Sequence, residues 1–427
     1  MIETATPSIV LPAARLRGRL AMPPDKSIAH RALIFAALSG GPSSVTMRSP
    51  GRDVLSTLNG LRALGVSVEH SGDRYVLSGR PSRDAVLDCG NSGTTMRLLA
   101  GAMAGLPLTV TLDGDASLRA RPMERVATLL RAAGARVTTT DGHAPMTVVG
   151  GDSLIATDHR LLVTSAQLLG AAVLAGMGAN GETTIETPGP TRDHTERMLA
   201  HLGVPIHRDG RMTTVTGPAR PRSFDMAVPG DPSAASAWLV AAAMHPDAEL
   251  TMVGVGINPT RLGLIGLLQR MGVDIEMRVT DAGGPEPVGD VVVRGGSPLR
   301  AVTVGGGEVA DLIDELPLVA MAMASVNEPS EVRDAGELRV KETDRITAVV
   351  AGLEAIGAEV EELSDGWRVR RGSPQAAQIT THGDHRIAIA FAIAGVTGIA
   401  STVELDDPDC VAVSYPDFWA DLMRVRS

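Results

Sequence analysis

The stretch Leu-Arg-Ala-Leu-Gly-Val-Ser-Val at residues 61–68 decides the fold, because its pattern returns along the chain. The pattern is Leu, three residues, Gly, a small apolar residue, one further residue, and then Val or Ile. Helical periodicity precedes the glycine, and the alternation typical of a strand follows it. Glycine often stands just past a helix end, where φ is positive. Each copy therefore predicts a helix, a glycine stop and a strand, with the glycines at Gly65, Gly134, Gly203, Gly272 and Gly357.

A second pattern lies upstream of each copy, where a short polar cluster opens an apolar, Ala-rich segment. Ser, Asp and Asn are good N-caps, and Pro fits the first turn of a helix. A sixth cluster of this kind lies near the C-terminus. The sequence therefore predicts six buried helices, at 28–38, 96–104, 168–175, 234–244, 318–324 and 387–395.

Together the two patterns define six repeats, each with one helix buried all round and one amphipathic helix. The sixth repeat stops after Leu422 without a following strand, and the strand-like stretch 8–22 is expected to supply the missing piece. Three repeats per domain then predict a middle domain at 25–228. The other domain combines 1–24 with 229–427.

The composition is that of a soluble globular protein, with 44% apolar and 21% charged residues among 427. A net charge of −10 and nine aromatic residues (4 Phe, 3 Trp, 2 Tyr) disfavour nucleic acid and membrane surfaces as partners. Two isolated cysteines, Cys89 and Cys410, are typical of a reduced compartment. The N-terminus lacks a secretory pattern, and no apolar run reaches the ~18 residues of a membrane helix. We therefore expect a cytoplasmic protein.

Lysine is almost absent: of 39 basic residues only Lys26 and Lys341 are lysines. Lysine is a compact charge on a flexible stem, and it can give up its proton when buried. Both lysines fall in polar motifs at predicted helix starts, which favours catalysis over chance retention on a solvated surface. Lys341 and Arg345 are four residues apart, so we expect them on one face of a helix.

Helix N-termini carry partial positive charge and unpaired N–H groups, so they bind anions. Arginine grips phosphate and carboxylate groups bidentately, and several predicted helix starts or polar loops carry Arg31, Arg97, Arg121, Arg192 and Arg386. For any single cluster, helix capping alone is the simpler interpretation. No nucleotide-binding, zinc-protease or serine-hydrolase motif is present, so no ATP, NAD, metal or acyl-serine chemistry is expected.

Four motifs are similar to those of the enolpyruvyl transferase family, and within it to the 5-enolpyruvylshikimate-3-phosphate synthases: Pro-Asp-Lys-Ser at 24–27, Gly-Asn-Ser-Gly-Thr-Thr at 90–95, Lys-Glu-Thr-Asp-Arg at 341–345 and Asp-His-Arg at 384–386. The resemblance covers nearly the whole chain, with features of the more divergent second class. It implies an α/β fold of two similar domains joined by a two-strand hinge. Each domain has three βαβαββ-type repeats with buried helices behind mixed sheets, an inside-out α/β barrel.

The same resemblance implies a reaction without cofactors. The enolpyruvyl group of phosphoenolpyruvate passes to the 5-hydroxyl of shikimate 3-phosphate by addition and elimination through a tetrahedral intermediate, and phosphate is released. This is a shikimate-pathway step of aromatic amino-acid biosynthesis. A monomer with these two small-molecule substrates is expected, with the middle domain on the shikimate 3-phosphate side and the other domain on the phosphoenolpyruvate side.

The resemblance also implies site residues. The catalytic set is Lys26, Asp314, Glu342 and Lys341, with Asp314 as candidate base. Shikimate 3-phosphate would be bound by Lys26, Ser27, Arg31, Ser165, Ala166, Gln167, Thr191, Arg192, Asp314 and Lys341. Phosphoenolpyruvate would be bound by Lys26, Asn91, Gly93, Arg121, Gln167, Lys341, Arg345, His385 and Arg386.

The chain departs from the family pattern at four positions, namely Leu98, Ala166, Glu337 and Val413. Leu98 and Val413, together with Gly93, lead us to expect partial sensitivity to glyphosate. The nearest rival is the enolpyruvyl transferase for UDP-N-acetylglucosamine, which usually has a reactive cysteine in the loop matching 113–122; none is present here. RNA-phosphate cyclases have related repeats, but the acidic chain disfavours them. A non-catalytic repeat scaffold is the alternative of another class.

Overall fold

The computed structural model describes residues 8–426, and these fall into two compact units. The middle unit contains Pro24–Pro229 and Gly283–Glu286. The end unit contains residues 8–23, Gly230–Ala282 and 287–426. The unit boundaries lie one residue from the predicted ones. The segment Gly283–Glu286 is a correction, because the sequence pattern places it in the other domain.

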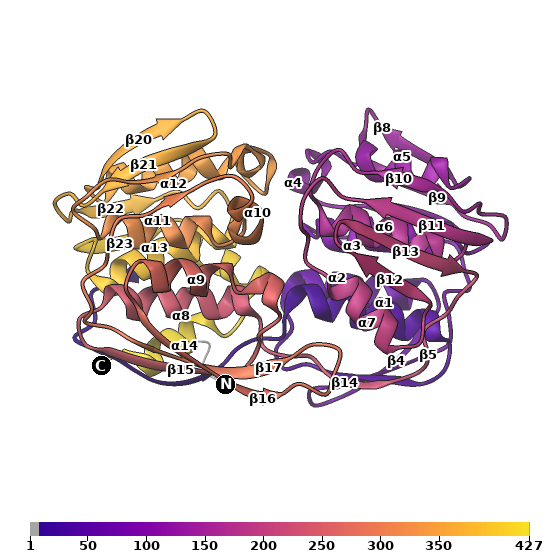
Figure 1. Ribbon diagram of the computed structural model, residues 1–427, viewed down its shortest axis with the longest axis horizontal. Helices are drawn as coiled ribbons and strands as arrows, with labels where there is room; N and C mark the ends of the chain where they lie inside the picture. The colour runs from indigo at the N-terminus through magenta and orange to yellow at the C-terminus, as the bar shows by residue number, and fades with distance from the viewer. Residues whose placement is uncertain (1–7, 427) are drawn as a thin grey trace. The chain divides into compact units, whose positions relative to one another are not determined.

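Each polar cluster opens a helix that is buried on every side, as predicted. In the middle unit α3 packs against both α1 and α6, and in the end unit α8, α11 and α13 pack against one another (Figure 1). Their side chains are almost all apolar beyond the first turn, so the core of each unit is built around these helices. The bounds are Lys26–Ser39 (α1), Gly93–Ala104 (α3), Ala166–Gly176 (α6), Pro232–Met244 (α8), Leu316–Ala324 (α11) and His385–Thr397 (α13).

The helices begin earlier than predicted, inside the polar clusters rather than after them. Side chains of Asp25, Ser92, Ser165, Asp231 and Asp384 accept hydrogen bonds from backbone N–H groups of the first turn. A side-chain cap satisfies donors that have no partner within the helix, so the residue just after it is already helical. The candidate residues Lys26, Gly93 and His385 therefore stand in first helical turns. Helix α11 instead begins with Pro317 in its first turn.

The amphipathic helices end where the glycine pattern predicts. All five predicted stop glycines have positive φ, between 82° at Gly203 and 101° at Gly272, which confirms them. The helices are Arg52–Ala63 (α2), Glu124–Ala132 (α5), His194–His201 (α7), Gly263–Arg270 (α9), Arg345–Ala355 (α12) and Phe418–Val425 (α14). Shorter helical segments are Ala116–Arg119 (α4), Glu308–Leu312 (α10), Pro259–Arg261 (η1), Gly336–Val340 (η2) and Pro408–Val413 (η3).

Within residues 8–426 the strands form six mixed sheets, three in each unit. In every four-stranded sheet a parallel pair is followed by two antiparallel strands, which is the βαβαββ repeat. In the middle unit the orders are β14 (Asp225–Ala227), β3 (Ser43–Thr46), β5 (Arg74–Ser78), β4 (Ser67–Ser71); β6 (Ala85–Asp88), β7 (Thr109–Asp113), β9 (His143–Val149), β8 (Arg136–Thr140); and β10 (Asp158–Arg160), β11 (Gly181–Glu186), β13 (Met212–Gly217), β12 (Ile206–Asp209).

In the end unit two sheets repeat this order and the third is shorter. The orders are β2 (Leu16–Ala21), β15 (Ala248–Gly256), β17 (Val288–Arg294), β16 (Asp274–Asp281); β18 (Thr303–Val304), β19 (Ser330–Val332), β21 (Gly366–Arg370), β20 (Glu359–Leu363); and β22 (Ala376–Ile379), β23 (Thr402–Leu405), β1 (Ile9–Val10). Each unit thus surrounds its buried helices with sheets, the inside-out α/β barrel that the resemblance implies.

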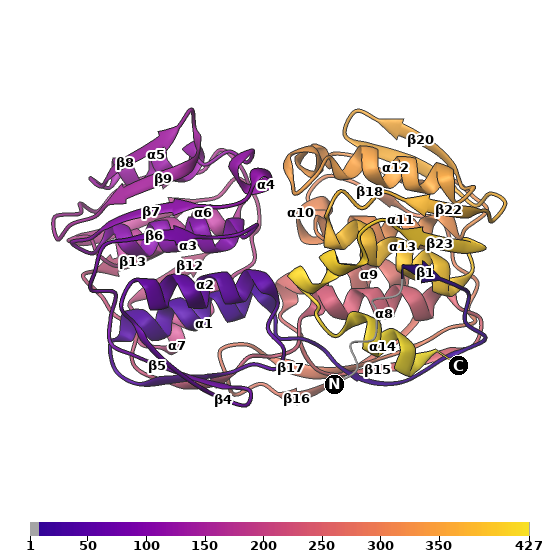
Figure 2. The same cartoon turned by 180° about the vertical axis from the view of Figure 1, so that it is seen from behind.

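The N-terminal stretch serves two repeats rather than one. Ile9–Val10 pairs antiparallel with β23 and completes the sixth repeat, as predicted (Figure 2). Leu16–Ala21, however, runs parallel to β15 and is the first strand of the fourth repeat. In the same way β14, at the end of the middle unit, pairs with β3 and supplies the first strand of the first repeat. The first strand of each unit's first repeat therefore comes from elsewhere in the chain.

Candidate active site

The first turns of α1 carry Lys26, Ser27 and Arg31, and the two charged side chains have partners on other helices. The Lys26 ammonium pairs with the carboxylate of Asp53, which is itself nearly buried in the first turn of α2. Arg31 lies one turn further along α1, where its Nη1 donates to the carbonyl of Ser27 at 2.9 Å and its Nε donates to Thr195 Oγ1 at 2.7 Å. Burial lowers the pKa of Arg31 to about 10, so the side chain stays cationic at neutral pH.

Helices α3 and α6 meet at their polar starts. Gln167 of α6 donates from Nε2 to Thr94 Oγ1 at 2.9 Å, and its Oε1 accepts from Arg97 Nη1 at 2.6 Å. Arg31 Nη2 donates to the carbonyl of Ala166 at 3.4 Å, which links α1 to the same place. The predicted residues on α1, α3 and α6 therefore form one continuous polar cluster of the middle unit. Ser165 belongs to it as the N-cap of α6.

The Gly-rich loop before α3 lies against a second arginine. Arg121 donates from Nη2 to Asn91 Oδ1, and Asn91 donates from Nδ2 to Asp115 at 2.9 Å. A Cβ added at Gly93 would lie 2.8 Å from Nη1 of Arg97 and 3.4 Å from Nη1 of Arg121. Glycine at this position therefore avoids a steric clash with the guanidinium group of Arg97 and a close contact with that of Arg121.

The loop before α7 is tied down by an arginine that sequence reasoning does not single out. Arg208 Nη1 donates to the carbonyl of Thr191 at 3.3 Å and pairs with Glu196 at 3.0 Å. Burial raises the pKa of Glu196. The loop also brings Arg192 close enough to Arg31 for its charge to lower the pKa of Arg31. Thr191 and Arg192 thus stand beside the cluster formed by α1 and α6.

In the end unit Arg345 gathers three carboxylates. Its Nε donates to Asp384 Oδ2 at 2.7 Å, its Nη2 donates to Glu342 Oε2 at 2.6 Å, and its Nη1 lies 3.9 Å from Asp314 Oδ1. Burial alone would lower the pKa of Arg345, but Asp384 and Glu342 more than offset it and raise the pKa. Arg386 donates from Nη1 to the carbonyl of Asp314 at 2.8 Å. The predicted residues of this unit are therefore brought together, with the buried His385 between Asp384 and Arg386 in the chain.

The expectation that Lys341 and Arg345 share a helix face is wrong. Lys341 ends η2 with an extended backbone, and α12 begins only at Arg345. The reason is a cap: the carboxylate of Asp344 accepts hydrogen bonds from the N–H groups of Ile346 and Thr347. Burial lowers the pKa of Lys341. The charge of Arg345 lowers it further and the charge of Asp314 opposes the lowering, so both side chains lie near Lys341.

Sequence reasoning missed several partners of the candidate residues. Asp53 follows Lys26 by 27 positions and has no motif around it. Glu315 accepts from Ser233, and Ser233 in turn accepts from Arg261 Nη2 at 2.7 Å, which ties the start of α11 to the start of α8. The polar cluster before α8 was a visible signal for Ser233. Nothing local marks Asp53 or Arg261.

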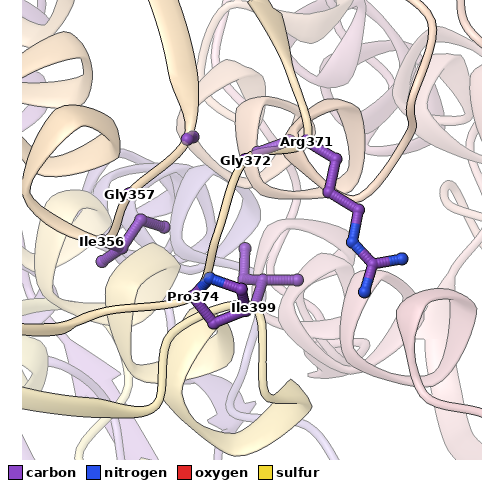
Figure 3. Close-up of a pocket in the computed structure, with 8 residues that line it drawn as sticks. Ile356, Gly357, Arg371, Gly372, Pro374 and Ile399 are labelled. Atoms are coloured by element: carbon purple, nitrogen blue, oxygen red, sulfur yellow. The ribbon is translucent and has the colours of Figure 1, made fainter.

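A pocket lies at the other ends of the end-unit helices. It is lined by residues that follow the C-termini of α12 and α13 and the end of β21, among them Gly357, Arg371 and Ile399 (Figure 3). The candidate residues stand at the helix N-termini, where the partial charge is positive. The pocket is therefore separate from the candidate site.

Residues 8–426 lack two further features. They contain no group of three or more His, Cys, Asp or Glu side chains that could hold a metal ion. None of the helices in this part of the chain has the length and apolar character needed to cross a membrane.

Curated relatives match the chain over almost its full length. A 3-phosphoshikimate 1-carboxyvinyltransferase of Herpetosiphon aurantiacus is 43% identical over 424 residues, covering 97% of this chain and 98% of the relative. Proteins of the same name from Chloroflexus aurantiacus and Gloeobacter violaceus are each 45% identical, covering 96% and 98% of this chain and 97% and 98% of their own lengths.

Solved structures and a family model agree with these relatives. An EPSP synthase from Acinetobacter baumannii superposes with a TM-score of 0.86 at 35% identity, covering 98% of both chains. An enolpyruvyl transferase from Streptomyces tendae shares the fold, with a TM-score of 0.78 at 19% identity over 98% of this chain and 96% of that one. The model described as EPSP synthase (3-phosphoshikimate 1-carboxyvinyltransferase) matches residues 10–422. The chain therefore belongs to the EPSP synthase family.

Proposed function

We propose that the protein transfers the enolpyruvyl group of phosphoenolpyruvate to the 5-hydroxyl of shikimate 3-phosphate and releases phosphate. The carrying observation is the gathering of cations beside carboxylates at the starts of buried helices, in a chain with only two lysines. Lys26 stands with Asp53, and the half-buried Lys341 stands near Arg345 and Asp314. Membership of the family supports the same reaction, because the relatives carry that activity in their names.

The residue assignments follow the two units. In the middle unit, centred on 25–228, shikimate 3-phosphate is bound by Lys26, Ser27, Arg31, Ser165, Ala166, Gln167, Thr191 and Arg192. The end unit contributes Asp314 and Lys341 to the same substrate. Phosphoenolpyruvate is bound by Lys26, Asn91, Gly93, Arg121 and Gln167 of that unit and by Lys341, Arg345, His385 and Arg386 of the end unit. Arginine forks suit phosphate and carboxylate groups, and the helix starts add N–H donors.

The proposed chemistry has two balanced steps. In the addition, the 5-oxygen bonds to C2 of phosphoenolpyruvate, its proton goes to a carboxylate, and C3 takes up a proton to become a methyl group. In the elimination, C3 loses a proton and the C2–O bond to phosphate breaks. Asp314 is the candidate base, with Glu342, Lys26 and Lys341 as the other groups able to move protons. The arginines stabilise charge on phosphate and carboxylate in the intermediate.

The first test measures phosphate release from phosphoenolpyruvate, with shikimate 3-phosphate and UDP-N-acetylglucosamine as separate acceptors and with no metal or nucleotide added. Release with shikimate 3-phosphate alone supports the proposal. Release with the nucleotide sugar alone would move the chain to the sister activity, and release with neither would favour a non-catalytic protein.

A substitution tests the base. Asp314→Asn should lower kcat by about 10²–10⁴-fold, because the amide cannot accept the hydroxyl proton. The KM for shikimate 3-phosphate should rise much less than it does in Lys26→Ala. Glu308→Gln is a matched control, since Glu308 has a similarly exposed carboxylate and pairs with Arg270 instead. Near-normal turnover of Asp314→Asn would remove its assignment as base.

The proposal further describes a monomeric cytoplasmic enzyme that needs no cofactor. A sedimentation mass near 44.3 kDa would agree with the monomer, and twice that mass would refute it.

A further inference from the structure

A chain of buried hydrogen bonds crosses three helices of the middle unit, behind the candidate residues. Nδ1 of His30, on α1, lies 2.7 Å from Oγ1 of Thr57, on α2. Oγ1 of Thr57 lies 2.7 Å from Oγ1 of Thr95, on α3, and Thr95 donates to Oγ of Ser92 at 2.8 Å. None of these four side chains is more than 1% exposed. The proposed function assigns no role to this chain.

The hydrogen bonds of this chain all run in one direction, from His30 towards Ser92. Burial and the nearby charges of Lys26 and Arg31 lower the pKa of His30 well below its usual value, so the imidazole is neutral at pH 7. A neutral imidazole carries one N–H. Nε2 of His30 is buried without a hydrogen-bond partner, and a buried N–H without a partner is costly. The proton therefore sits on Nδ1 and is donated to Thr57, whose hydroxyl donates to Thr95.

The two ends of the chain reach the starts of α1 and α3. His30 lies one helical turn after Lys26, and Thr57 lies one turn after Asp53, the partner of Lys26. The hydroxyl of Thr95 also lies 3.3 Å from the backbone carbonyl of Asp53. At the far end Ser92 caps α3, directly between Asn91 and Gly93. Buried side-chain hydrogen bonds between neighbouring helices hold one helix in register with the next.

We propose that Thr57, together with His30 and Thr95, is a positioning residue that holds α1 in register with α3 and so places Lys26 relative to Asn91 and Gly93. This rests on the proposed function, in which those three residues hold phosphoenolpyruvate and Lys26 also contacts shikimate 3-phosphate. The shikimate 3-phosphate group depends on other links of α1, namely the bonds of Arg31 to Thr195 and to Ala166. Of the three placed residues only Lys26 is also assigned to shikimate 3-phosphate, so loss of these hydrogen bonds should affect phosphoenolpyruvate more strongly than shikimate 3-phosphate.

The test compares Thr57→Val with Thr57→Ser. Valine keeps the shape but removes the hydroxyl, which leaves His30 and Thr95 without their shared partner. We expect the KM for phosphoenolpyruvate to rise about tenfold, as loss of a buried hydrogen bond costs about that factor. The KM for shikimate 3-phosphate should rise clearly less, because the bonds of Arg31 to Thr195 and to Ala166 remain. Thr57→Ser keeps the hydroxyl and should restore the KM for phosphoenolpyruvate.

Two further variants separate positioning from general loss of stability. Thr183, on β11, is equally buried, but its hydroxyl has no hydrogen-bond partner, so Thr183→Val should leave both KM values unchanged. The double variant Thr57→Val/Thr95→Val should be no worse than Thr57→Val, because the chain is already broken. An equal rise of both KM values, or an unchanged KM for phosphoenolpyruvate in Thr57→Val, would overturn the proposal.

Amide hydrogen exchange on the same proteins without substrate tests the positioning role independently of the proposed function. Thr57→Val should speed exchange in peptides that cover the first turns of α1 and α3, and Thr57→Ser and Thr183→Val should not. If the wild type shows no turnover and Thr57→Val still speeds exchange, the positioning role is supported and the proposed function is overturned. Unchanged exchange would overturn the positioning role even if the wild type is active.

Discussion

Arg345 and Asp384 form a buried ion pair at the point where α12 and α13 begin. The two side chains are 1% and 0% exposed, and Asp384 also caps α13 by accepting from the N–H of Arg386. A charge held this way is stable only while its partner is present, because water cannot replace the lost contact. Asp384 therefore supports both the proposed site, through Arg345, and the local fold, through the cap of α13.

Arg345→Met should lower the free energy of unfolding by about 3–5 kcal/mol, because it leaves the buried carboxylate of Asp384 without its cation. Urea unfolding followed by circular dichroism measures the change. Arg370→Met is the control, since Arg370 forms an exposed pair with Glu359, and it should cost less than about 1 kcal/mol. Equal losses in the two variants would contradict the burial argument.

Lys341 predicts a pH dependence of activity. Burial, with the charge of Arg345, lowers its pKa from the usual 10.5, so the folded enzyme loses this proton at a lower pH than an exposed lysine does. A step that needs the ammonium form is then fully active on the acid side and is lost as pH rises through the lowered pKa. The alkaline fall in kcat/KM should therefore have its midpoint below 10.5.

The check on Lys341 uses Lys341→Arg. A guanidinium keeps its charge throughout this range, so the residual activity of the variant should lack the alkaline fall. Phosphate release measured between pH 7 and the onset of unfolding gives both profiles. The same alkaline midpoint in both proteins would show that another group causes the fall.

At the scale of elements, the close contact of α3 and α6 depends on a glycine. A Cβ added at Gly101 of α3 would lie 2.4 Å from the backbone oxygen of Ala171 and 2.7 Å from its Cα. Backbone atoms cannot move aside as a flexible side chain can, so a larger residue must push the helices apart. The same two helices carry Arg97 and Gln167, whose hydrogen bond crosses between them.

Gly101→Ala should therefore destabilise the protein by about 1–3 kcal/mol through overpacking, and weaken the Arg97–Gln167 contact. Gly266 is the matched helical glycine, because it lies in α9 with open space where its Cβ would be. Gly266→Ala should stabilise by up to about 1 kcal/mol, since alanine is the better helix former. Thermal and urea unfolding test the pair, and shifts of the same sign would refute the packing argument.

At the scale of the whole molecule, the chain enters the middle unit a second time. Strands β16 and β17 belong to an end-unit sheet, yet Gly283–Glu286 between them groups with the middle unit. Glu286 is buried there, and its Oε1 lies 2.7 Å from Nδ1 of His194, in the first turn of α7. The next residue of α7, Thr195, holds Arg31. A short hairpin tip thus takes part in the core behind the candidate site.

Glu286→Ala should lower the free energy of unfolding by about 1–3 kcal/mol, because it leaves the buried imidazole of His194 without its partner. Cleavage of the segment by a protease should also become faster. Glu276→Ala in the same hairpin is the control, since Glu276 forms an exposed pair with Arg278 and should cost less than about 1 kcal/mol. Indistinguishable unfolding curves for the two variants would contradict a role for the tip.

The sequence by itself determined the repeat, because the signals of the repeat are local. A glycine with positive φ after Leu64 or Ala133, and a capping Asp or Ser before an apolar segment, act through bonds within a few residues. The family motifs are equally local, so they indicate Lys26 and Arg345 without any knowledge of the fold. The caps also explain why the helices begin before their predicted starts: the polar residues after each cap already belong to the first turn.

Tertiary structure alone decided which distant residues meet. The pairing of Leu16–Ala21 with β15, the partner of Lys26 on α2, and the burial of Glu286 beside His194 join positions far apart in sequence. No local pattern marks them, because each depends on the shape of surfaces that exist only once the helices are packed. The same holds for Lys341, whose pKa is lowered by burial and by the charge of Arg345, against the opposing charge of Asp314.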